Sequence, residues 1–226
     1  METMCTLSTM PHTHAPVQNA GQGRSTYRHG ALHQALLDAG VAMAREGGPD
    51  AVVLREATRR AGVSPNAAYR HFSDREALVA AVSDAASSAS AAVIEAEWDA
   101  VPAGSPADTA HAHLRAVGTG YLRFARDEPG LFRAAYTVPS DLVQAFSPEK
   151  AGPSGRTPFQ LLGIAIDEMV AAGLMPAERR PGAELRAWSA VHGLAMLVLE
   201  GPLRDLDDET LQQTARGLID MVDRGL

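Results

Sequence analysis

The chain has 226 residues, of which 46% are hydrophobic, and its formal net charge is −7. That length allows two compact units, and that hydrophobic content is ample for a buried core. No apolar run approaches the roughly 20 residues that a membrane-spanning helix needs, and the first residues lack the basic start and apolar core of a secretory signal. The single cysteine, Cys5, cannot form an internal disulfide. We therefore expect a cytoplasmic protein without membrane contact.

The charge is distributed unevenly along the chain. Residues 24–80 carry eight arginines and six acidic residues, whereas residues 81–226 carry 12 basic and 20 acidic residues. A polyanionic partner would therefore bind the first part and be repelled by the second. We predict a disordered tail at 1–23, a first domain at 24–80 and a second domain at 81–226.

The first helix is predicted from Tyr27 to Glu46. Its apolar residues recur at spacings of four, three and four, which places them on one face of a helix. Glycine and proline at positions 47–49 end it. Arg24 and Arg28 suit either a basic arm that contacts the DNA backbone or a solvated tail. The apolar positions are Leu32, Leu36, Ala39 and Met43.

The stretch from Leu54 to Leu78 reads LREATRRAGVSPNAAYRHFSDREAL. After a short Arg-rich helical run, Gly62 can adopt the left-handed backbone that closes a helix. Ser64 can cap the next helix, and Pro65 fits its first turn. The short polar helix Pro65–Phe72 follows. This pattern predicts a helix-turn-helix whose second helix enters the DNA major groove; the alternative is a solvated helical hairpin.

The residue types of this segment suit contact with nucleic acid. Arg70 and Asn66 can reach base edges or phosphates, and the hydroxyls of Tyr69 and Ser64 can donate to phosphate oxygens. The complete predicted DNA-binding set is Arg55, Ser64, Pro65, Asn66, Ala67, Tyr69, Arg70, His71 and Arg75.

Residues 27–82 resemble the DNA-binding domain of the tetracycline-repressor (TetR) family. The matching motifs are AGVS at Ala61–Ser64, YRHF at Tyr69–Phe72 and DREAL at Asp74–Leu78. At the position of Arg75 the family usually has a lysine that contacts phosphate, and arginine keeps that charge. The resemblance implies a transcriptional regulator that binds double-stranded operator DNA.

The rest of the chain predicts helices and no strand, so the expected fold class is all-α. The helix-turn-helix domain is followed by a helical domain for ligand binding and dimerisation. Ser73 or Asp74 is expected to cap the helix after the DNA-binding segment, and a Pro/Gly-rich loop at residues 147–158 is expected to be mobile. The predicted helices are 74–98, 107–127, 129–136, one that begins near Phe159 and is closed by Gly173 and Pro176, 183–201 and 207–224.

The segment Arg186–Gly201 is apolar on most of its circumference, which predicts a buried helix. With apolar residues of the last helix it would give two helices per subunit to a four-helix seam, so we predict a homodimer through 183–201 and 207–224. Residues 113–133 and the WSAVHG segment at 188–193 also resemble a TetR subclass named for its Trp-His-Gly signature, which implies small-molecule binding. The apolar residues of the last helix are Leu211, Leu218, Ile219 and Val222.

Aromatic and methionine side chains of the second domain suit an apolar effector. The same side chains at helical spacing also suit an ordinary core, and a lone buried histidine is more often a hydrogen-bonded core group. No catalytic motif, structural zinc spacing or cofactor motif is present. The candidate ligand-binding residues are Tyr121, Phe124, Met169, Trp188 and His192.

These patterns together predict a ligand-responsive repressor that binds a palindromic operator as a homodimer and responds to an unknown small-molecule effector. One alternative is a helical small-molecule-binding module or enzyme without operator binding. Another is a non-specific nucleoid-type protein, against which the acidic second domain argues.

Overall fold

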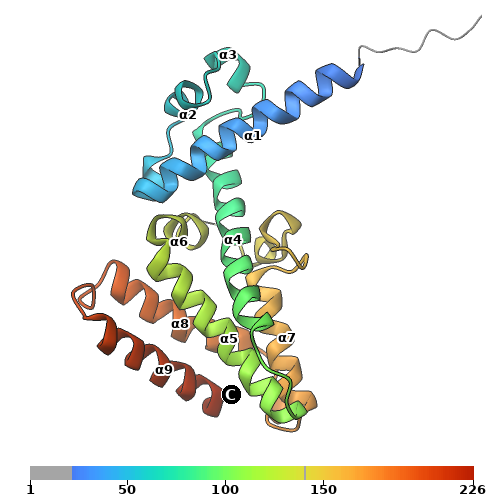
Figure 1. Cartoon of the computed structure of the whole chain (residues 1–226), viewed down its shortest axis with the longest axis vertical. Coiled ribbons are helices and arrows are strands. Elements are labelled where there is room, and N and C mark those ends of the chain that lie inside the picture. The colour runs from blue at the N-terminus through green and yellow to red at the C-terminus, as the bar shows by residue number, and fades with distance from the viewer. Residues whose placement is uncertain (1–21, 140) are drawn as a thin grey trace, which may run out of the picture.

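The computed structural model describes residues 22–139 and 141–226, with side chains from residue 30 on, and this part contains helices and no strand, as predicted. Figure 1 shows a head, made of the first three helices, and a body, made of the last five, with α4 running from one into the other. The head contains α1 (Gln22–Gly47), α2 (Leu54–Arg60) and α3 (Pro65–Ala68). The connecting helix is α4 (Arg75–Asp99). The body contains α5 (Pro106–Asp127), α6 (Pro129–Tyr136), α7 (Pro158–Ala171), α8 (Ala183–Leu199) and α9 (Asp208–Gly225).

Helix starts coincide with short polar residues that cap the first turn. The side chain of Asp74, one of the two predicted caps, accepts a hydrogen bond from the backbone N–H of Ala77 at 2.8 Å. Thr157 and Gln160 form a reciprocal capping box at the start of α7. These bonds satisfy backbone donors that have no partner inside the helix, so the helix bounds follow closely from local sequence.

The contact between α4 and α5 is unusually close. A Cβ added to Gly120 of α5 would lie 2.6 Å from the Cα of Ile94 on α4. The buried residues of α4 include the small Ala86, Ser90 and Ala91. The long Ala/Ser stretch of this helix therefore permits the close approach that its composition indicates.

Among the described helices, α4 is long and apolar enough to cross a membrane by length and composition alone, with a mean hydropathy of 1.6 over 18 residues. The expectation that no run approaches this limit is therefore wrong by that measure. Half of this window is buried inside the protein, where α4 packs against α5 and α6. Its apolar surface thus belongs to the core.

The body also contacts the head through α6. A Cβ on Gly130, near the start of α6, would lie 2.3 Å from the carbonyl oxygen of Ala44 on α1. Beside this contact, Arg45 Nε pairs with Glu128 Oε2 at 2.8 Å. The end of α1 therefore rests directly on the body, independently of α4.

The Pro/Gly-rich loop at 147–158 packs against α4, contrary to the expectation that it is mobile. Ser88 Oγ donates to the carbonyl of Ala151 at 2.6 Å. Ser154 Oγ donates to Glu95 Oε1 at 2.7 Å. The short 3₁₀ turn η3 (Pro148–Lys150) lies within this segment, and a second one, η2 (Leu142–Phe146), precedes it. The proline and glycine content of the loop alone did not reveal this structure.

The last two helices are only partly buried within the single chain. α9 is fixed at its C-terminal half, where the buried carboxylate of Asp223 lies 2.6 Å from His111 Nδ1 and 3.0 Å from Arg115 Nε. On α8, Leu185 and Leu197 are each 45% exposed. The segment 186–201 is therefore only partly buried within a single chain, and whether the dimer seam covers the rest stays a prediction.

The Gly120 contact gives a test of this packing. We expect Gly120→Ala to lower the free energy of unfolding by about 1–3 kcal/mol, because the added methyl group must displace backbone atoms of α4. Gly30→Ala is the matched control, since its Cβ would meet no atom within 4 Å, and it should be neutral or stabilise by up to about 1 kcal/mol. Urea denaturation followed by circular dichroism measures both. Equal stability of the two variants would contradict the close α4–α5 contact.

Candidate DNA-binding face and effector cavity

The α2–α3 segment forms the predicted helix-turn-helix. Gly62 adopts a φ of 67° between the helices, and Ser64 Oγ accepts a hydrogen bond from the N–H of Ala67 at 3.4 Å. The α-helix is shorter than the predicted 65–72, because the N–H groups of Arg70 and His71 bond to carbonyls only three residues earlier. This tightening continues the turn to Phe72 in 3₁₀-like geometry.

One side of α3 is fixed against the head. Ala68 is fully buried and Phe72 is 3% exposed, with the ring of His33 stacked on Phe72 at a centroid separation of 4.7 Å. Ala67 and His71 are half-buried beside them. This packing turns the opposite side of the segment outward.

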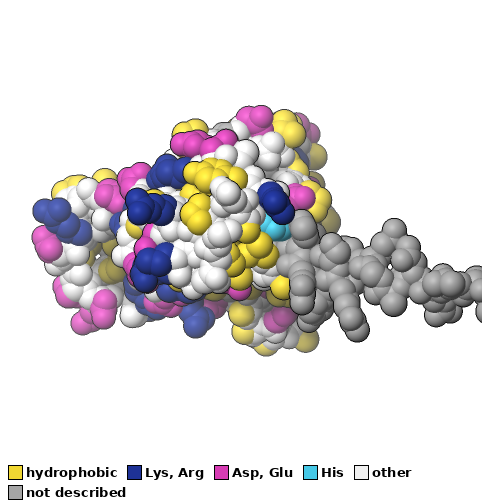
Figure 2. Space-filling view, turned by 90° about the horizontal axis from the view of Figure 1, so that it is seen from above, with side chains coloured by type: hydrophobic (Ala, Val, Ile, Leu, Met, Phe, Trp, Pro, Cys, Tyr) yellow, Lys and Arg dark blue, Asp and Glu magenta, His cyan; other side chains and the backbone are white. Residues whose placement is uncertain are grey.

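The outward side carries most of the predicted DNA-binding residues. Tyr69 is 58% exposed, and the other exposed members are Arg55, Ser64, Pro65, Asn66 and Arg70. Figure 2 looks onto this end of the molecule and shows basic side chains among uncharged and acidic ones.

The arginines of the head differ in their partners. Arg59 and Arg60 pair with Glu56, and hydrogen bonds from these two guanidinium groups lower the pKa of Glu56 to about 2. Arg55 and Arg70, by contrast, make no ion pair within residues 30–139 and 141–226. Their charges are therefore available to an external anion.

Arg75 has a role that the sequence did not indicate. Its Nε donates to the carbonyl of Val52 at 2.8 Å, and its Nη2 donates to the carbonyl of Pro49 at 2.9 Å. The start of α4 is thereby fixed to the 3₁₀ turn η1 (Pro49–Ala51) that precedes α2. The phosphate contact inferred for Arg75 stays a prediction.

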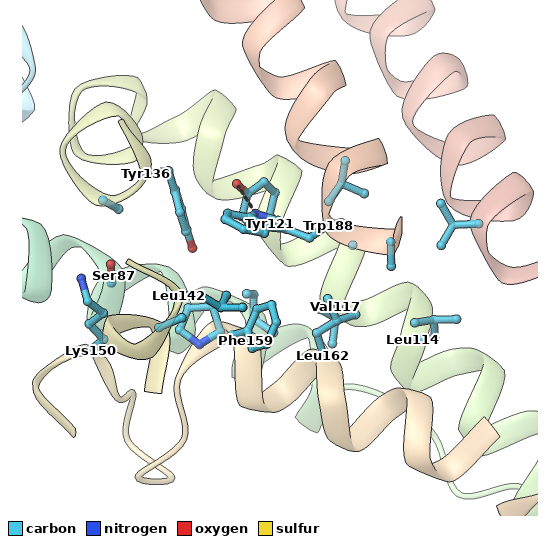
Figure 3. A pocket seen from close by; sticks show the side chains of 18 of the residues that line it. Ser87, Leu114, Val117, Tyr121, Tyr136, Leu142, Lys150, Phe159, Leu162 and Trp188 are labelled. Carbon is cyan, nitrogen blue, oxygen red and sulfur yellow. Dashed lines mark hydrogen bonds between the residues drawn. The ribbon is translucent and has the colours of Figure 1, made fainter. Parts of the chain in front are cut away.

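A cavity of about 240 Å³ lies in the body between α4, α5, α6, α7 and α8. Two of the predicted ligand-binding residues, Tyr121 and Trp188, line it. Phe159 lies beside them in Figure 3, with its ring edge-on to that of Trp188 at a centroid separation of 6.2 Å. Other wall residues that sequence reasoning missed include Ser87, Tyr136, Leu142 and Lys150.

Phe124 and Met169 do not line this cavity. Each is 1% exposed, and the ring of Phe124 packs near Phe132 at a centroid separation of 6.5 Å. The structure places both residues in the core. The sequence prediction was wrong for them because helical periodicity does not distinguish a core position from a cavity wall.

A hydrogen-bonded group borders the cavity. Tyr121 Oη lies 2.8 Å from His192 Nδ1 and accepts from Trp188 Nε1 at 3.2 Å. Burial raises the pKa of the Tyr121 hydroxyl well above its usual value and lowers the pKa of His192. Both groups are therefore neutral near neutral pH, and the hydrogen bond between them joins two uncharged side chains. His192 supports the wall from behind instead of lining it.

Two family models match the chain and together cover most of it. Residues 36–82 match "Bacterial regulatory proteins, tetR family", and residues 114–222 match "Tetracyclin repressor-like, C-terminal domain". The chain belongs to the TetR family. It is a DNA-binding transcriptional regulator, and dimerisation and a response to a ligand are typical of this family. The likeness to the Trp-His-Gly subclass stays a prediction.

Solved structures agree with this fold. A protein of unknown function from Rhodococcus sp. RHA1 is 26% identical, with a TM-score of 0.67, and the match covers 88% of this chain and 97% of that one. A TetR family transcription regulator from Marinobacter aquaeolei VT8 is 20% identical, with a TM-score of 0.58 and coverage of 86% and 97%. None of the curated proteins compared with the chain matches it.

Substitutions of Arg75 and Arg55 test two different roles in this TetR-family head, structural anchoring for Arg75 and DNA contact for Arg55. We expect Arg75→Ala to lower the free energy of unfolding by about 1–3 kcal/mol, because two carbonyls lose a charged donor. Arg55→Ala should change stability by less than about 0.5 kcal/mol, yet weaken DNA binding and lower its salt dependence. Thermal unfolding and DNA titration of both variants measure these effects. An unchanged stability of Arg75→Ala would remove its anchoring role.

Proposed function

We propose that this TetR-family protein is a cytoplasmic, ligand-responsive repressor that binds a palindromic operator as a homodimer. The observation that carries the proposal is the outward side of the α3 segment, where Asn66, Tyr69 and Arg70 are exposed. Their side chains have no hydrogen-bond or ion-pair partner in the described part of the chain. Residues 24–80 would bind DNA and residues 81–226 would dimerise and bind the effector.

Asn66 and Arg70 are four residues apart and lie on one side of the recognition segment. Amide and guanidinium groups are those that read adenine and guanine edges in the major groove. Tyr69, Ser64 and Arg55 would hold the DNA backbone, since hydroxyl and guanidinium groups donate to phosphate. In a two-fold dimer the two segments would meet half-sites about one helical turn or a small multiple apart.

The exposed sides of α8 and α9 support the dimer. Leu185, Ser189, Gly193 and Leu197 are exposed at intervals of four residues on α8. On α9, Gly217 and the 55% exposed Met221 follow the same interval. Such a strip, apolar at its ends with small residues between them, suits close packing against a second copy of the same two helices. We therefore assign the dimer contact to this exposed strip in place of the residues Leu211, Leu218, Ile219 and Val222 that the sequence suggested. Of these, Ile219 packs against Gly118 inside the chain.

The effector cavity is connected to the head through two helices. Ser87 and Ile94 of α4 line it, as do Ala135 and Tyr136 of α6, and the other end of α6 rests on α1 through Gly130. A ligand that binds one arrangement of these helices more tightly would shift the separation of the two heads.

Fluorescence-anisotropy titration of the whole protein tests the proposal. The probes are DNA from upstream of its own gene and a scrambled control, each at two salt concentrations. We expect a preference of about a thousandfold or more for the upstream DNA, with affinity falling steeply as salt rises. Equal binding to both probes would favour a non-specific DNA-binding protein. No binding to any promoter fragment would favour a small-molecule-binding module or an enzyme.

Substitutions in the recognition segment should separate base reading from backbone contact. We expect Asn66→Ala or Arg70→Ala to change the preferred operator sequence, at a cost of about 1–3 kcal/mol for the original site. Tyr69→Ala should weaken binding to all sequences alike, because phosphate contacts carry no sequence information. Selection from a randomised operator library measures both effects. An unchanged preference in Asn66→Ala and Arg70→Ala would exclude base reading by these residues.

The dimer has its own test. We expect Met221→Glu combined with Leu197→Glu to shift the protein to monomer in analytical ultracentrifugation, because charge would be buried in the interface. Val143→Glu is the matched control, since Val143 is 76% exposed and lies on η2, away from α8 and α9. A double variant that stays dimeric would exclude this face as the seam.

A further inference from the structure

Lys150 is the only lysine of the chain, and it lines the cavity. The residue is 7% exposed, and its Nζ lies 2.9 Å from Asp84 Oδ1. Asp84, whose side chain is 30% exposed, does not line the cavity. A ligand in the cavity would therefore meet Lys150 and not the carboxylate that balances its charge.

Ser87 adds a second donor at the same place. It follows Asp84 by three residues on α4 and so lies one turn away on the same side of the helix. Ser87 is 3% exposed and makes no hydrogen bond within the described chain. Every fully buried polar side-chain atom in the described chain has a hydrogen-bond partner. Because the Ser87 oxygen has none, it is not fully buried and is open to the cavity that this residue lines.

The remaining wall is largely apolar. Figure 3 shows Lys150, Ser87 and Tyr136 toward one end of the cavity and Leu114, Val117 and Leu162 toward the other. The hydroxyl of Tyr136 already bonds to Ser90 Oγ at 2.7 Å. The cavity thus combines one cationic, donor-rich end with an apolar body.

One acidic residue, Asp141, also lines the cavity. It is exposed, and its Oδ1 accepts a hydrogen bond from the N–H of Gln144 at 3.0 Å as the cap of η2. Its carboxylate is therefore hydrated and engaged on the outer wall, whereas Lys150 is shielded from water. A charge that is shielded from water interacts more strongly with a ligand than a hydrated one.

We propose that the effector is a small apolar monocarboxylate whose carboxylate is bound by Lys150 and Ser87. An ammonium group has three donors, so Lys150 can hold Asp84 and the ligand together. The cavity volume of about 240 Å³ is below the usual range of about 300–1,000 Å³, which favours a compact ligand. The inference rests on the proposed effector role of this cavity and names the chemistry of its ligand.

Isothermal titration calorimetry with three eight-carbon probes tests the inference: octanoate, 1-octanol and octylammonium. Their apolar bodies match, so affinity differences report the head group. We expect octanoate to bind the full-length protein about tenfold or more tighter than 1-octanol, because charge-assisted hydrogen bonds are stronger than neutral ones. Octylammonium should bind weakest.

Variants locate the head group. Lys150→Met should bring octanoate down to the affinity of 1-octanol while leaving 1-octanol binding unchanged, which also shows that the cavity is intact. Arg156→Met removes the same charge from an exposed position of the same loop and should leave all three affinities unchanged. Asp84→Asn removes the competing carboxylate and should tighten octanoate binding, a change opposite in direction to that of Lys150→Met.

Equal affinity for octanoate and 1-octanol, or tighter binding of octylammonium, would overturn the inference. Failure of all three probes to bind would overturn it as well. The operator titration without ligand is independent of these results, so a failed effector assignment is distinguishable from a failed repressor assignment.

Discussion

The packing of α4 against α5, where Gly120 meets the backbone of Ile94, is the contact on which both halves of the molecule depend. α4 supplies part of the head core through Leu78 and Val82 and part of the body core through Ala91 and Ile94. A helix shared by two cores cannot tilt in one without disturbing the other, because close-packed interiors do not deform continuously. This constraint makes α4 suitable for transmitting a change from the cavity to the DNA-binding face.

The head is built so that one side is fixed and the other is free. Ala68 and Phe72 hold the α3 segment from behind, and Arg75 fixes the turn before α2 through two carbonyls. The exposed arginines of the head likewise fall into two groups, one paired with acidic residues and one without such partners. Arg59 and Arg60 are engaged with acidic residues, while Arg70 stays without an ionic partner in the described chain. The modest positive charge of this end is thus concentrated at a few positions and not spread over a surface.

The body has a comparable arrangement around its cavity. Tyr121, Trp188 and His192 satisfy one another by hydrogen bonds, so these polar groups leave an uncharged wall. The ammonium group of Lys150 is the buried charge on this wall, and the loop that carries it is held on α4 by Ser88 and Glu95. A ligand at this end would act directly on the helix that enters the head.

The sequence alone determined the all-α class, most helix bounds and the helix-turn-helix, because capping residues, Gly62 and periodic apolar positions act locally on the backbone. It also placed Tyr121 and Trp188 among the candidates, since aromatic side chains in apolar helices are few. Only the tertiary structure decided that Phe124 and Met169 are core while Lys150 and Ser87 line the cavity. Only the tertiary structure revealed that Arg75 donates hydrogen bonds to carbonyls 23 and 26 residues earlier in the chain. Helical spacing fixes which residues share a face, but what that face meets depends on helices distant in the chain.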